Sequence, residues 1–132
     1  MARQSRLPTI AARKIAKMKV KVLFVDTYLF IRTNEGFWPG LPFDVVRALK
    51  PTHLVLVEAS PEEILARRGA DRTRYRDDVT RGDLESELSL ARSFLAASST
   101  LTGAPMLIAT NSQGKSDEVA SGLAGVLKEA SA

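Results

Sequence analysis

The sequence has 132 residues, of which 45% are hydrophobic and 26% charged, the balance of a globular domain. It contains no cysteine and one histidine, which excludes disulfides, thiol nucleophiles and zinc sites built from these residues. No apolar run approaches the roughly 20 residues that cross a bilayer, and no signal-peptide pattern occurs, so we expect a cytoplasmic protein without a membrane partner.

The net charge of +4 is unevenly distributed. The first 21 residues contain no acid, and their basic residues are Arg3, Arg6, Arg13, Lys14, Lys17, Lys19 and Lys21. Such an arm is typical of an anionic partner such as nucleic acid, and the alternative is a solvated helix face.

In chain order, the first predicted element is a helix over residues 8–18, indicated by apolar residues at helical spacing, within a basic helical segment of residues 1–21. Residues 21–26 are apolar on both faces, as in a buried parallel strand. Residues 33–42 are dense in turn formers and predict a loop. A helix over residues 43–49 should follow, ended by Pro51.

Residues 53–58 predict a second apolar strand. A helix should start at Ser60, because a hydroxyl at the N-cap is followed by Pro61 at the first helical position. The arginine-rich stretch 67–82 comes next, with guanidinium groups at Arg67, Arg68, Arg72, Arg74, Arg76 and Arg81. This stretch favours phosphate binding, and a surface loop with arginine–aspartate pairs is the alternative.

Asp83 is the predicted N-cap of the longest helix, which should end near Gly103. A third strand over 106–109 and a helix capped by Ser116 complete the pattern. Strands that alternate with helices predict one α/β domain over residues 1–132, with a parallel sheet and flanking helices.

Ligands of parallel sheets bind beyond the carboxyl ends of the strands. Here these ends are Asp26, Glu58 and residues 109–110. Residues 109–116 also fit a loosened phosphate-loop pattern, with alanine in place of the first glycine. A turn before a helix capped by Ser116 is the alternative that we favour.

Three segments together resemble a known family. Residues 23–42 are similar to the "(V/I)DTH…I(K/R)T..GYLPGLP" stretch of archaeal-type adenylate kinases, with Tyr28 in place of the usual histidine and Trp38 in place of leucine. Residues 57–61 resemble that family's "(V/L)E.(S/D)P" turn, and residues 68–77 its "R..D.TR.R(D/N)" lid. The likeness extends from about residue 11 to the C-terminus.

The resemblance implies a nucleoside monophosphate kinase fold of the P-loop NTPase class and the reaction ATP + AMP ⇌ 2 ADP with Mg²⁺, often in a homotrimer. It gives Asp26 the magnesium-side carboxylate role. It also implies phosphoryl-transfer roles for Arg68, Arg74, Arg76 and Arg92, and nucleotide-binding roles for Arg32, Asn111 and Gly114.

The resemblance also defines what the 132 residues do not contain. The family begins with a strand, a Gly-rich phosphate loop and most of a monophosphate-binding segment, and none of these is found here. We therefore expect a truncated kinase core that is inactive alone. The alternative is a non-catalytic module that binds nucleotide or RNA through its arginine-rich lid and basic N-terminal arm.

Overall fold

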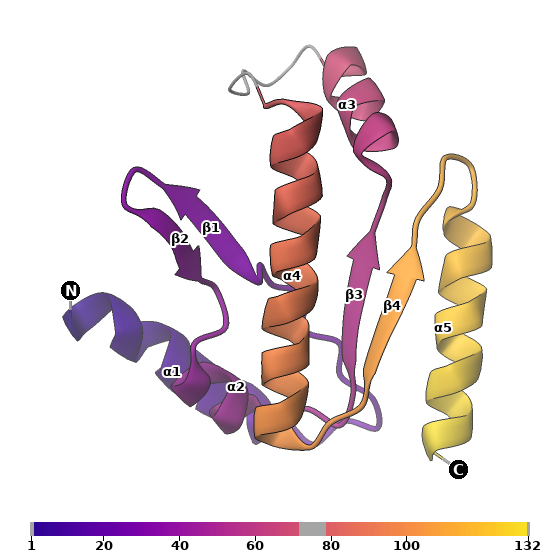
Figure 1. Cartoon of the computed structure of the whole chain (residues 1–132). Coiled ribbons are helices and arrows are strands. Elements are labelled where there is room, and N and C mark those ends of the chain that lie inside the picture. Colours follow the sequence, from indigo (N-terminus) through magenta and orange to yellow (C-terminus); the bar gives the residue numbers. More distant parts are fainter. Residues whose placement is uncertain (1, 72–78, 132) are drawn as a thin grey trace. The chain divides into compact units, whose positions relative to one another are not determined.

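The computed structural model describes residues 2–71 and 79–131 of the chain (Figure 1). The chain divides into two compact units, one of Met1–Leu54 with Ser93–Met106 and one of Val55–Arg92 with Leu107–Ala132. Its elements are α1 (Ala2–Ala16), β1 (Phe30–Thr33), β2 (Gly36–Pro39), α2 (Phe43–Leu49), β3 (Leu54–Glu58), α3 (Pro61–Ala70), α4 (Arg81–Thr102), β4 (Met106–Thr110) and α5 (Ser116–Ser131). Among the described residues, no helix is both long and apolar enough to cross a membrane.

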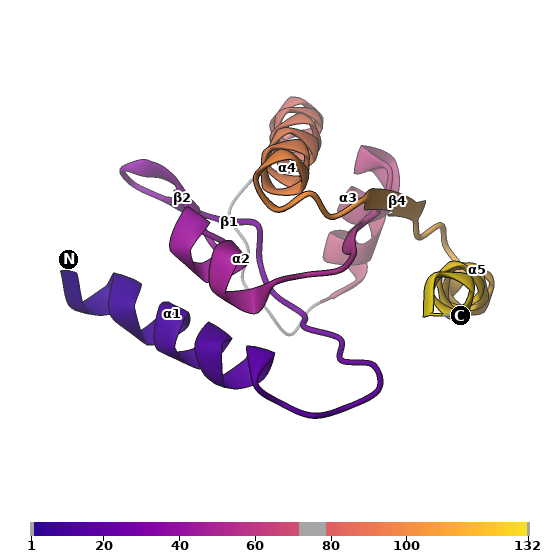
Figure 2. The same cartoon turned by 90° about the horizontal axis from the view of Figure 1, so that it is seen from below.

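The first unit contains a pair of packed helices, α1 and α2 (Figure 2). Ala12 of α1 and the adjacent Val45 and Val46 of α2 are buried, each less than 6% exposed. Helix α2 has the predicted bounds, and Lys50 ends it in the left-handed conformation with φ of 50°. Helix α1 begins earlier than its apolar spacing indicated and continues through Pro8, where the helix interior lacks one backbone donor.

The segment 21–26, predicted as a buried strand, is not a strand in the structure. Residues 21–26 are exposed, and Phe24 is 74% exposed. A strand requires a neighbour that pairs with its backbone, and no described residue pairs with this segment. The sequence therefore identified an apolar segment correctly but assigned it the wrong structure.

The region 33–42, predicted as a loop, instead contains most of a β-hairpin. Strands β1 and β2 pair antiparallel, with Thr33 opposite Gly36 and Ile31 opposite Trp38. The turn formers supply the two-residue connection between the strands, and Gly36 has φ of 113°, a conformation that glycine tolerates. The edge-to-face contact of Phe30 with Phe37, at 5.1 Å between ring centroids, adds packing across the hairpin.

Strands β3 and β4 form a two-stranded sheet and run in the same direction (Figure 1). The Leu54 N–H donates to the Pro105 carbonyl at 3.0 Å, and the Asn111 N–H donates to the Glu58 carbonyl at 2.7 Å. Both strands lie within one residue of their predicted bounds. The α/β class, with a parallel sheet and flanking helices, is confirmed.

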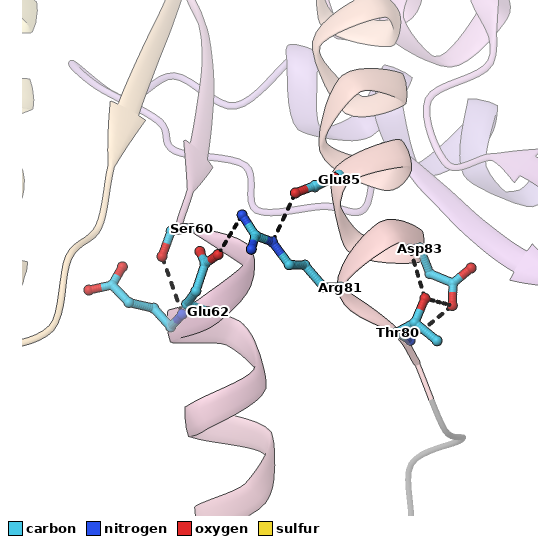
Figure 3. Close-up of polar contacts among 7 residues, drawn as sticks. Ser60, Glu62, Thr80, Arg81, Asp83 and Glu85 are labelled. Carbon is cyan, nitrogen blue, oxygen red and sulfur yellow. Dashed lines mark hydrogen bonds and ion pairs between the residues drawn. The ribbon is translucent and has the colours of Figure 1, made fainter.

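Helices α3 and α4 each begin directly after a residue that caps the helix N-terminus (Figure 3). The Ser60 hydroxyl accepts from the Glu63 N–H at 3.2 Å, as predicted. Asp83 was the wrong N-cap for α4, because Thr80 holds that position. The Thr80 hydroxyl accepts from the Asp83 N–H, and the Asp83 carboxylate accepts from the Thr80 N–H, which is a reciprocal capping box.

Candidate functional site

The carboxyl ends of β3 and β4 bring two predicted strand-end positions together. Glu58 is the last residue of β3, and its carbonyl accepts the backbone N–H of Asn111, which follows β4. Polar groups placed at this edge of a parallel sheet are well placed to meet a ligand. The contacts of Arg92, Arg67 and the turn of residues 111–115, described next, all belong to the second unit.

Arg92 of α4 forms a two-pronged ion pair with Glu58. Its Nε donates to Glu58 Oε2 at 3.0 Å, and its Nη2 donates to Glu58 Oε1. The Glu58 side chain is only 9% exposed, whereas that of Arg92 is 56% exposed. Five guanidinium N–H groups less the two used here leave three for another ligand. The pair therefore fixes Arg92 while leaving donors free.

This ion pair shifts both groups toward their charged forms. Hydrogen bonding from Arg92, aided by its charge, lowers the pKa of the Glu58 carboxyl, although burial acts in the opposite direction. Hydrogen bonding to Glu58, with the carboxylate charge, raises the pKa of Arg92. Glu58 thus stays ionised through the neutral range and keeps Arg92 in place.

Arg67 connects α3 to the turn after β4. Its Nη2 donates to the Asn111 carbonyl at 2.8 Å, and its Nε donates to Gln113 Oε1 at 3.4 Å. The Gln113 N–H in turn donates to Glu63 Oε1 at 2.8 Å. The family resemblance implies a role for the adjacent Arg68 but for neither Arg67 nor Gln113. Nothing in the local sequence pattern distinguishes the two arginines.

The turn of residues 111–115 is built around Asn111 and Gly114. The Ser116 hydroxyl donates to Asn111 Oδ1 at 3.2 Å, and Gly114 has φ of 73°, which favours glycine. The Lys115 carbonyl accepts the first helical bond, from Val119, so Lys115 and not Ser116 holds the N-cap position of α5. The Lys115 ammonium pairs with Glu118 at 2.9 Å, an arrangement unlike a lysine held for a phosphate.

The remaining predicted site residues lie in other surroundings. Arg68 on α3 is half-buried, and its Nε is buried with no hydrogen-bond partner among residues 2–71 and 79–131. Asp26 and Arg32 belong to the first unit, where both are exposed and the Arg32 guanidinium lies 5.6 Å from the centre of the Phe37 ring. Arg74 and Arg76 lie outside the described residues, so their roles stay predictions.

Arg81, at the end of the arginine-rich stretch, forms ion pairs with glutamates, whereas the alternative expected arginine–aspartate pairs in a surface loop. It pairs with Glu62 of α3 at 2.9 Å and with Glu85 of its own helix at 3.0 Å (Figure 3). All three side chains are more than half exposed. Exposed pairs of this kind contribute little to stability, about 0–1 kcal/mol, so Arg81 acts as a surface link between two helix starts.

The family resemblance implies a single carboxylate, Asp26, as the protein's ligand for Mg²⁺. Within residues 2–71 and 79–131, no three His, Cys, Asp or Glu side chains are grouped to hold a metal ion. Mg²⁺ is commonly bound through one or two carboxylates with the rest of its shell from waters and nucleotide phosphates. The exposed Asp26 fits that arrangement and does not fit a metal site built from protein ligands alone.

The Glu58–Arg92 pair predicts a pH effect. Because the folded pKa of Glu58 is lowered, its stabilising contribution is present above its unfolded value near 4.5 and is lost as pH falls through the folded pKa. In Arg92→Gln, burial acts unopposed and the pKa of Glu58 should rise. Carboxyl NMR titration measures the change, with Arg81→Gln as a matched control that leaves Glu58 unaffected. Equal Glu58 titration in all three proteins would contradict the assignment.

Comparison with known proteins identifies the family. A family model described as "AAA domain" matches residues 1–85. The adenylate kinase of Methanococcus aeolicus is 38% identical over 126 residues, covering 95% of this chain and 65% of that protein. The adenylate kinase of Thermoplasma volcanium is 36% identical over 125 residues, covering 95% of this chain and 68% of that protein. The chain belongs to the adenylate kinase family.

The chain matches only part of the length of these adenylate kinases. A third adenylate kinase, from Thermoplasma acidophilum, is 39% identical over 110 residues, and the chain spans only 59% of its length. Across these three relatives the chain therefore spans between 59% and 68% of their length. The family resemblance inferred from residues 23–42, 57–61 and 68–77 is confirmed.

Proposed function

We propose that this chain carries out, as part of an adenylate kinase, the reversible transfer of a phosphoryl group from ATP to AMP. The observation that supports the proposal most is the cluster of Glu58, Arg92, Arg67 and Asn111 at the carboxyl ends of two parallel strands. This cluster occurs in a chain that is 36–39% identical to proteins named adenylate kinase.

The proposed roles follow from what each group can donate. Arg92, held by Glu58, offers its free N–H donors to phosphate oxygens as charge develops during transfer. Arg68, Arg74 and Arg76 would add positive charge from the lid. The buried, unpartnered Nε of Arg68 is consistent with a donor that finds its acceptor only on a bound ligand.

Nucleotide binding would use the remaining residues. Arg32 is the proposed contact for the AMP phosphate, and Asn111 and Gly114 form the turn proposed to lie against adenine. Asp26 would hold Mg²⁺ or its waters together with nucleotide phosphates, and the ion would supply neutralising positive charge on those phosphates. The family resemblance also supports a cytoplasmic location and a homotrimer.

A chimera tests the proposed activity. The part of the Methanococcus aeolicus adenylate kinase that this chain does not match is joined to residues 1–132, and ADP formation from MgATP and AMP is followed in a coupled assay. We expect turnover that falls by at least about a hundredfold in Arg92→Ala, the size of effect seen when one transition-state donor is removed.

The control is Arg81→Ala, which removes an arginine engaged in exposed ion pairs and should leave turnover within about twofold. A folded chimera that binds ATP but forms no ADP would overturn the proposal and favour the binding-only alternative. Equal losses in Arg92→Ala and Arg81→Ala would refute the role of Arg92.

A further inference from the structure

A basic groove lies between α1 and α2 in the first unit, on elements that the kinase proposal leaves largely unused. Its volume is about 640 Å³. Its lining consists of Thr9, Arg13, Ala16, Lys17, Asp44, Arg47, Ala48 and Lys50. Four cations and one carboxylate leave a net charge of +3 around this basic groove.

The four cations of the basic groove, Arg13, Lys17, Arg47 and Lys50, have no ion-pair partner in the part of the chain that the structure describes. The Arg47 guanidinium lies over an aromatic face, 5.8 Å from the centre of the Phe43 ring. By contrast, Arg81, Arg92 and Lys115 in the second unit are all paired. Like charges gathered in one groove repel each other, and a bound anion would relieve that repulsion.

The backbone at Lys50 is a second, independent observation. Lys50 has φ of 50° at the end of α2, a left-handed position that glycine or asparagine usually occupies. A lysine there carries a backbone cost that glycine would avoid. Its presence is explained if the ammonium group contributes to binding in the basic groove, which Lys50 lines.

The chemistry of the lining indicates the kind of ligand. None of the described residues that line the basic groove is aromatic, so their side chains offer no surface on which bases stack. Guanidinium and ammonium groups instead bind phosphate oxygens. Positive charge also extends along the chain beyond the groove, because residues 1–25 contain no acid. We propose that the basic groove binds a chain of phosphate groups, as in the backbone of single-stranded nucleic acid, without regard to base sequence.

Fluorescence anisotropy with dye-labelled 12-mers of U and of A tests binding to the 132-residue chain. We expect equal affinity for the two oligomers and a linear fall of log K with log salt. Four neutralised phosphates correspond to a slope of about −2.8, at about −0.7 per contact for single strands. An unlabelled polyphosphate of matched charge is the competitor. If polyphosphate displaces RNA only at large excess, the site is assigned to nucleic acid. If it displaces RNA at equal concentration, the site is assigned to phosphate chains in general.

Charge substitutions locate the site. Arg13→Ala and Lys17→Ala should each weaken binding about two- to fivefold and reduce the salt slope by about 0.7. Lys14→Ala is the matched control, since Lys14 is on the same helix but does not line the basic groove. Asp44→Asn should strengthen binding, because it removes the only carboxylate of the lining.

Lys50→Gly separates binding from folding. It should leave the free energy of unfolding unchanged or increased, because glycine suits the left-handed position, while it weakens RNA binding about two- to fivefold. Lack of RNA binding in 50 mM salt, or equal losses in Lys14→Ala and Arg13→Ala, would overturn the proposal. Because these measurements use binding and not ADP formation, they are independent of the kinase test.

Discussion

The 132-residue chain, purified alone, should form ADP from MgATP and AMP at least about a thousandfold more slowly than the Methanococcus aeolicus adenylate kinase. Phosphoryl transfer depends almost entirely on positioning and on electrostatic stabilisation of the transferred group. Backbone amides of a Gly-x-x-x-x-Gly-Lys-Ser/Thr loop supply much of that positioning, and the 132 residues contain no such loop. Loss of even one comparable donor costs about 10²–10³ in rate, and here the whole loop is lacking.

The structure argues against residues 109–116 as a replacement for this loop. In residues 109–116, Lys115 is paired with Glu118, and Asn111 is bonded to Ser116. Lys115→Ala should therefore leave ATP affinity of the chain unchanged. Turnover by residues 1–132 within tenfold of the Methanococcus aeolicus enzyme would contradict the expectation, and loss of ATP binding in Lys115→Ala would show that the phosphate site has moved to this turn.

Elements specified by local signals were predicted well. Helix α2 lies between Pro42 and Pro51, and α3 starts at Ser60, where a capping hydroxyl and Pro61 coincide. Strands β3 and β4 are short apolar runs whose hydrogen bonds come from each other. These features depend on residues close in sequence, or on two strands that are both present and adjacent.

Two segments of the first unit were predicted wrongly, for different reasons. Residues 21–26 have the composition of a strand, but a strand forms only where another backbone supplies its hydrogen bonds. The hairpin of β1 and β2 was hidden by its turn formers, which suggest a loop when they are read without the flanking residues. Composition therefore indicated which segments are apolar, but it did not indicate which other segments pair with them or pack against them.

The candidate site was also predicted in part: the strand-end positions were predicted, and the partners of the arginines were not. The rule that ligands meet the carboxyl ends of strands placed Glu58 and residues 109–110 correctly at one edge. Which arginine reaches which acceptor could not be read from spacing, because Arg92 and Glu58 are 34 residues apart and Arg67 and Asn111 are 44 apart. Helix orientation selects Arg67 over Arg68 for the turn, and that selection is a property of tertiary packing.

Gly40→Ala should lower the free energy of unfolding by about 1–3 kcal/mol, the usual cost of overpacking. The Gly40 N–H donates to the Leu29 carbonyl at 2.8 Å, which holds the backbone after β2 against the segment before β1. A Cβ at position 40 would lie 1.9 Å from the Tyr28 carbonyl oxygen and 2.8 Å from its carbon. The obstacle is backbone rather than a flexible side chain, so relief requires separation of the two segments.

Urea denaturation followed by Trp38 fluorescence measures this loss, because Trp38 is the only tryptophan and lies in β2, two residues from Gly40. Gly122→Ala is the matched control: its Cβ would meet nothing within 4 Å in the interior of α5, so it should raise stability by about 0.5–1 kcal/mol. A Gly40→Ala protein with the parent's urea midpoint would mean that the hairpin and residues 28–29 are not held together in solution. The predicted result, a lower midpoint in Gly40→Ala and a higher one in Gly122→Ala, would tie the stability of the hairpin to this single close approach of backbones.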